Sequence, residues 1–100
     1  MLVVAGSVRI DPAKRDDVIE ATIEVMQETR KLPGCISFVF SADLEEPGVL
    51  HVFQEWESQE ALDRHLAEPR LEAVRLRLGS LGVRETAVHR YAIQSVGPIV

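Results

Sequence analysis

The three histidines are the side chains of this sequence best suited to proton transfer or metal binding. His51 and His65 are 14 residues apart, and His65 and His89 are 24 apart. Zinc proteases and mononuclear iron sites use closely spaced ligands, and that spacing does not occur here. A metal site assembled by the fold from His51, His89 and a carboxylate stays open as an alternative.

His65 is the strongest candidate for a proton acceptor. An imidazole titrates near neutral pH, and the neighbouring Leu62 and Leu66 are expected to face the core, which would bring the ring partly inward. The simpler interpretation is a partly buried histidine that makes one hydrogen bond. The functional interpretation is a general base at the mouth of a pocket.

Other familiar catalytic motifs are missing from the sequence. The six glycines form no phosphate-binding loop, and no serine lies in the context of a catalytic nucleophile. Cys35 follows a Pro-Gly turn, and a buried inert thiol is favoured over a nucleophile there. Trp56 is most simply an anchor of the core. Four arginines are expected on the solvated sides of the later helices: Arg64, Arg70, Arg75 and Arg77.

The composition is that of one globular domain. The chain has 100 residues, 46% hydrophobic and 27% charged, with 16 acidic against 11 basic side chains and a formal charge of −5. This balance disfavours nucleic acid or an anionic membrane as a partner. No apolar run could span a bilayer, and the first residues lack a secretory signal pattern. We therefore expect a cytoplasmic protein with a single domain over 1–100, made of a core over 2–93 and a tail over 97–100.

Hydrophobic periodicity predicts seven elements of secondary structure. Alternation of apolar residues, or a high β-branched content, indicates strands at 2–10, 35–43, 49–57 and 83–96. Helical spacing indicates helices at 12–31 and 59–67, and a third helix that opens at Pro69 and ends at Gly79 and Gly82. The apolar face of the first helix is expected to comprise Val18, Ile19, Ile23, Val25 and Met26.

This order, β-α-β-β-α-α-β, predicts an α+β fold of the ferredoxin-like, split-βαβ type, with a four-stranded antiparallel sheet and helices on one face. The other face of the sheet is also apolar, since Val39, Val49 and Phe53 alternate with the main apolar set of the hairpin. An exposed patch of that size requires a partner. We expect a homodimer in which two sheets pack face to face.

Three segments resemble the antibiotic biosynthesis monooxygenase (ABM) family. They are Asp11–Arg15 before the first helix, Leu32–Phe38 with its Pro-Gly-Cys turn, and Gln54–Leu66, which reads QEWESQEALDRHL. The resemblance covers about residues 2–93. It is fairly specific for the fold and not for the reaction.

The resemblance implies a dimeric α+β barrel, and it implies oxidation of quinols, anthrones or related aromatic polyketides by O2 without metal, flavin or haem. Such a reaction needs an apolar pocket and a base of near-neutral pKa. His65 is then the first candidate for the catalytic base and His51 the second. The expected substrate-binding residues are Trp56, Phe38, Phe40 and Tyr91 as pocket walls, with Tyr91 or Ser7 bonding a quinol oxygen.

Other activities remain compatible with this family resemblance. A haem-degrading branch uses Asn, Trp and His at positions that align with Ser7, His65 and Arg75, and the missing axial histidine argues against haem. A non-catalytic small-molecule-binding or stress-associated dimer is one alternative. A proton-transferring isomerase or lyase on the same fold is the other.

Overall fold

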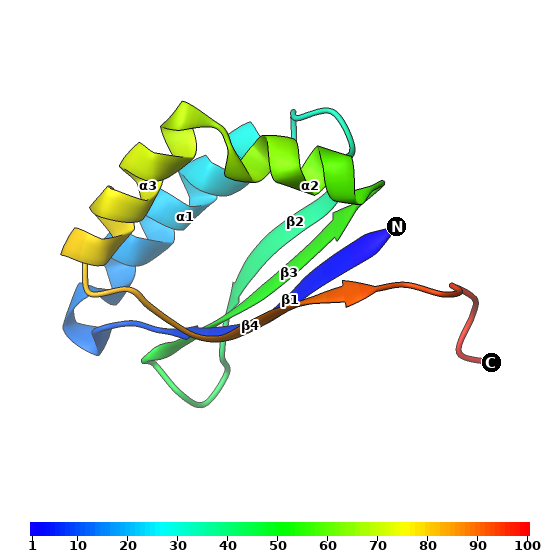
Figure 1. Ribbon diagram of the computed structural model, residues 1–100. Helices are drawn as coiled ribbons and strands as arrows, with labels where there is room; N and C mark the ends of the chain where they lie inside the picture. Colours follow the sequence, from blue (N-terminus) through cyan, green and yellow to red (C-terminus); the bar gives the residue numbers. More distant parts are fainter.

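The computed structural model describes residues 1–100 except for the side chains of Glu85 and Thr86. It confirms the predicted α+β, ferredoxin-like class: a four-stranded antiparallel sheet carries the helices on one face and leaves the other face open (Figure 1). The elements are β1 (Leu2–Arg9), a 3-10 helix η1 (Pro12–Lys14), α1 (Arg15–Thr29), β2 (Cys35–Ala42), β3 (Val49–Trp56), α2 (Gln59–Leu66), α3 (Pro69–Ser80) and β4 (Arg84–Ala92).

The sheet has the strand order β2-β3-β1-β4, so the first and third strands are central. Because side chains alternate along each strand, the register decides which residues face the helices. Leu2 pairs with Trp56, Val4 with Gln54 and Val8 with Leu50, and these residues share the helix-covered face. Their strand neighbours lie on the open face.

Local sequence signals set most of the helix boundaries. The Asp11 side chain accepts a hydrogen bond from the Ala13 N–H at 3.0 Å, and Ser58 accepts one from the Ala61 N–H at 3.1 Å. The helix predicted at 12–31 is a 3-10 turn followed by α1. Gly79 does not end the last helix, which runs on to Ser80 and stops before Gly82, at φ +81°.

The buried face of α1 differs from the expected one. Ile23 is 44% exposed, whereas two threonines, Thr22 and Thr29, are buried beside Val18, Ala21 and Val25. The Thr22 hydroxyl donates to the Ile19 carbonyl at 2.9 Å, which satisfies its donor inside the helix. A threonine with a local partner can therefore occupy a position that hydrophobicity alone assigns to an isoleucine.

The core consists of two clusters rather than one. The first surrounds Trp56, with Leu2, Phe38 and Leu62; the second surrounds Val18, with Leu50 and Val52. Phe40 packs against both clusters. Among the described side chains, α3 contributes none that is fully buried, so this helix covers the sheet without filling the space beneath it.

Two of the three segments that carry the family resemblance, Leu32–Phe38 and Gln54–Leu66, meet in space. Gly34 has φ +82°, and a Cβ atom on it would lie 2.5 Å from the Ala61 Cβ, so only glycine allows α2 to pack this closely on the turn. The Gly34 carbonyl accepts a hydrogen bond from the Glu57 N–H at 2.8 Å. Cys35, paired with Trp56 in the register, is partly buried, and burial raises the pKa of its thiol. These contacts fix the position of α2 on the sheet.

Candidate functional site

A cavity of about 590 Å³ lies between the helices and the sheet. Its lining comes from all four strands and from α1, α2 and α3, and it is mostly apolar. Val8, Leu50 and Val52 on the strands and Leu78 on α3 are typical of it. His65, the residue predicted as the proton acceptor, is part of the lining.

His65 sits in an aromatic environment at the end of α2. Its ring stacks on Trp56 with a centroid distance of 4.9 Å and an interplanar angle of 23°. Phe38 meets it edge-on at 5.8 Å and 73°. The side chain is 5% exposed, and its Nδ1 atom is buried without a hydrogen-bond partner in the described structure. The orientation of the ring is thus fixed by packing rather than by a hydrogen bond.

The surroundings of His65 favour the neutral imidazole. Burial lowers the pKa of His65, because a charged ring loses hydration inside the protein. The carboxylate of Glu68 acts in the opposite direction, and the positive charges of Arg70 and Arg75 lower the pKa further. A neutral histidine has a free ring nitrogen at neutral pH, which is the state that accepts a proton.

The aromatic residues predicted as pocket walls take different positions. Phe38 and Phe40 line the cavity and meet edge to face at 5.6 Å and 70°. Trp56 is fully buried behind His65, and its Nε1–H donates to the Gln54 Oε1 at 3.0 Å. Trp56 therefore supports the imidazole and does not itself form the cavity wall.

The expected placement of Tyr91 and Ser7 at the cavity is corrected by the register. Tyr91 pairs with Val3, and Ser7 pairs with His51, in the set of residues that alternates with the helix-facing one. All three predicted residues, Ser7, His51 and Tyr91, therefore lie on the open face of the sheet. A shift of one residue along a strand reverses the face of every side chain.

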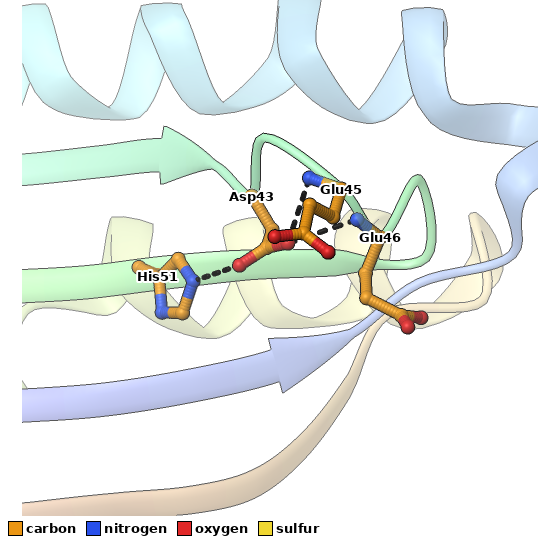
Figure 2. A network of polar contacts seen from close by, with 4 residues as sticks. All are labelled: Asp43, Glu45, Glu46 and His51. Carbon is orange, nitrogen blue, oxygen red and sulfur yellow. Dashed lines mark hydrogen bonds and ion pairs between the residues drawn. The ribbon is translucent and has the colours of Figure 1, made fainter.

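His51 belongs to a polar network at the end of the β2–β3 hairpin (Figure 2). Its Nε2 atom lies 2.7 Å from the Asp43 Oδ1. The other oxygen of Asp43 accepts hydrogen bonds from the backbone N–H groups of Glu45 at 3.0 Å and Glu46 at 2.8 Å. The hydrogen bonds from His51 and then from these two amides lower the pKa of Asp43 to about 2.

These contacts give His51 a structural role, because it bonds the Asp43 carboxylate that holds the hairpin turn. In the part of the chain whose side chains are described, no group of three or more His, Cys, Asp or Glu residues has the arrangement of a metal site. The alternative of a site built from His51, His89 and a carboxylate is thus not formed there. No described helix is long and apolar enough to cross a membrane.

The cavity has further polar residues that were not among the predicted site residues, including Gln54, Gln59, Arg75 and Arg90. The signals were present. Gln54 lies two residues before Trp56 on the same strand and so faces the same side, and Arg75 follows Leu71 by one helical turn on the predicted apolar stripe of α3. Arg75 was expected on a solvated helix side, and in the structure it is exposed yet borders the cavity.

Comparison with known proteins identifies the family. The model of the antibiotic biosynthesis monooxygenase (ABM) family matches residues 1–75. The chain belongs to the ABM family. This match contains β1 to α2, including the Gly34 turn, Trp56 and His65.

Relatives of the ABM chain share its fold over nearly its whole length. A proposed antibiotic biosynthesis monooxygenase from Deinococcus radiodurans superposes with a TM-score of 0.92 at 23% identity, covering 100% of this chain and 99% of that one. Rv0793 from Mycobacterium tuberculosis gives 0.83 at 25% identity, with 97% and 98% covered. "Uncharacterized protein sll1783" from Synechocystis sp. is 34% identical over 68 residues, which are 68% of this chain and 46% of that protein. The match thus spans about half the length of this curated relative.

Proposed function

We propose that this ABM-family protein is a cofactor-independent monooxygenase that oxidises a small aromatic hydroquinone or polyketide-like phenol with O2. The observation that carries the proposal is His65, a buried imidazole held by two aromatic rings in the wall of a largely apolar cavity of about 590 Å³. Membership of the ABM family supports oxygenase chemistry in that cavity.

His65 acts as the general base in this proposal. A hydroquinone or an anthrone that gives its proton to the imidazole becomes an electron-rich anion. This anion passes one electron to O2, and recombination of the resulting radical with superoxide forms the new carbon–oxygen bond. For an anthrone, protonation gives a hydroperoxide, which loses water and leaves a carbonyl group. One oxygen atom thus enters the product and the other leaves as water.

The cavity supplies the conditions that this reaction needs. Phe38 and Phe40 offer an aromatic surface against which a flat substrate ring can pack. The apolar lining keeps water from the anion and from superoxide. Trp56 has a positioning role, because it holds the imidazole from behind at 4.9 Å without reaching the cavity.

We further propose that the chain works as a homodimer in the cytoplasm, with two open sheet faces in contact. Phe53 is 43% exposed and Tyr91 50% exposed on this face, together with Val39. Sedimentation of the wild type at micromolar concentration should give the mass of two chains, and Phe53→Glu should shift it to one. A wild-type monomer under these conditions contradicts the dimer.

The oxygenase proposal is tested by oxygen uptake with a panel of hydroquinones and anthrones in the presence of a chelator. Wild-type protein should consume O2, and His65→Ala should lose most of this activity. His51→Ala is the matched control, since it removes a histidine from the hairpin network instead. Equal rates for wild type and His65→Ala would remove His65 from the mechanism.

The product mass separates this function from its alternatives. A gain of oxygen supports the monooxygenase. A product with the mass of the substrate identifies an isomerase, and tight binding without turnover identifies a small-molecule-binding protein. Either of these last two results overturns the oxygenase proposal.

A further inference from the structure

The charged side chains that line the cavity are all basic. The chain as a whole carries a formal charge of −5, yet the lining contains two arginines, Arg75 and Arg90, and, among the described side chains, no Asp or Glu. Acidic residues outnumber basic ones by 16 to 11 in the sequence. A cationic lining in an acidic protein favours a negatively charged ligand.

Arg90 reaches the cavity from the edge strand of the sheet. It pairs with Val4, which places it on the helix-covered face of β4. Its Nη1 donates to the side-chain oxygen of Gln59, the first residue of α2. Among the described side chains, no carboxylate pairs with its guanidinium.

Arg75 approaches from the opposite side, on the helix that covers the cavity. Its positive charge lowers the pKa of His65. The described structure gives Arg75 no carboxylate partner either. By contrast Arg77, two residues further along α3, pairs with Glu24 of α1 at 3.0 Å. Arg77 therefore serves as an internal comparison: an arginine of the same helix with a partner already in place.

Gln54, Arg90 and His65 lie at the same end of the cavity. Gln54, Val4 and Arg90 lie in one row across three neighbouring strands, and Phe38 of β2 extends that row. His65 contacts Phe38 and so belongs to the same end. Val8 and Leu50, which pair four residues further along these two strands, are apolar. A ligand with one charged end and one apolar end therefore fits the polar and apolar parts of the cavity.

We propose that the substrate is an aromatic acid: a hydroquinone or phenol that also carries a carboxylate, which Arg75 and Arg90 bind. This inference rests on the proposed function and specifies its substrate class. A planar guanidinium matches a carboxylate through paired hydrogen bonds. The same positive charges offset the negative carboxylate, which would otherwise hinder loss of the phenolic proton to His65.

The test compares two ligands that differ by a single carboxylate: 1,4-dihydroxy-2-naphthoate and 1,4-dihydroxynaphthalene. Binding to the intact protein is measured by calorimetry without oxygen, so that no turnover occurs. The wild type should bind the acid at least about 10-fold more tightly than the neutral diol. Arg75→Gln and Arg90→Gln should each weaken binding of the acid by about 10- to 100-fold, the range of a charge-assisted hydrogen bond. Binding of the diol should change less than about 3-fold.

Arg77→Gln is the matched control and should leave the preference for the acid unchanged. Arg75 is an exposed helix residue, so its variant tests the idea even if loss of the bond from Arg90 to Gln59 disturbs the fold. Equal wild-type affinities for acid and diol would overturn the inference. Variants that slow oxidation while binding of the acid is unchanged would also overturn it, because the arginines would then act only on the anion formed during the reaction.

Oxygen uptake with the same two ligands separates this inference from the oxygenase proposal. Arginine-dependent binding of the acid without oxygen consumption supports the aromatic-acid ligand and contradicts the oxygenase. A second outcome is that the neutral diol is oxidised as fast as the acid and that both arginine variants are fully active. In that case the oxygenase stands and the carboxylate preference is wrong.

Discussion

His65 and His51 are the same residue type in opposite surroundings. His65 is packed between aromatic rings, carries a buried Nδ1 without a partner, and has a lowered pKa. His51 lies at the end of a hairpin, half in solvent, and is paired with Asp43 at 2.7 Å. The comparison shows that a histidine engaged in holding a turn is explained by the fold, whereas a buried one with unused hydrogen-bonding capacity points to a ligand or a reaction.

The largest expected effect separates the two histidines by activity. His65→Gln should lower kcat/KM by about 10² to 10⁴, the usual contribution of a general base. His51→Gln should change kcat/KM by less than about 3-fold, because it lies on the other face of the sheet. Initial oxygen-uptake rates on a hydroquinone measure both. Comparable losses in the two variants would break the distinction.

The second prediction concerns the support of His65. Trp56→Ala should destabilise the protein by about 3–5 kcal/mol, since it removes the largest fully buried side chain of the core. Tyr91→Ala on the half-exposed face should cost much less in the isolated chain. Chemical denaturation of each variant, in a monomeric background such as Phe53→Glu, gives the two free energies. Similar costs would mean that the aromatic cluster around His65 is not the centre of the fold.

The pH dependence of His65 has a definite sign. Because its pKa is lowered in the folded protein from the ordinary value of 6.5, the imidazole stays neutral as pH falls through 6.5. We expect kcat/KM to hold down to that pH and to fall only below it. The unfolded chain takes up the proton first, so this residue also reduces the free energy of unfolding as pH drops below 6.5, until the folded pKa is reached. An activity profile with its acid limb above pH 6.5 would contradict this.

The smallest expected effect belongs to the hairpin. The pKa of Asp43 is lowered from 3.8 to about 2, so its contribution to stability is present above pH 3.8 and is lost as pH falls towards 2. Asp43→Asn should remove this acid-dependent part and leave oxygen uptake at neutral pH unchanged. Acid denaturation curves of wild type and variant provide the measurement. A loss of activity in the variant would connect the hairpin to the cavity.

Sequence patterns predicted the fold closely and the site only partly. Strand alternation placed Phe38 and Phe40 on the helix-covered face, because a period of two is enough to assign a face. Tyr91 and Ser7 were misplaced because aromatic or hydroxyl chemistry was considered without the register of their strands. Thr22, Arg75 and Arg90 were missed for a different reason. The burial of Thr22 depends on a local hydrogen-bond partner, and the place of the exposed Arg75 and Arg90 depends on the cavity that they border. Neither is visible in hydrophobicity.

The covering helix α3 has a consequence for how this scaffold can diversify. It has no fully buried described side chain, and a Cβ atom added at Gly79 would meet nothing within 4 Å although this residue borders the cavity. A larger side chain there would take up ligand volume without disturbing the sheet, the aromatic support or the Gly34 turn. Variation along this one helix can therefore change the shape of the cavity while the part of its wall around His65 stays the same.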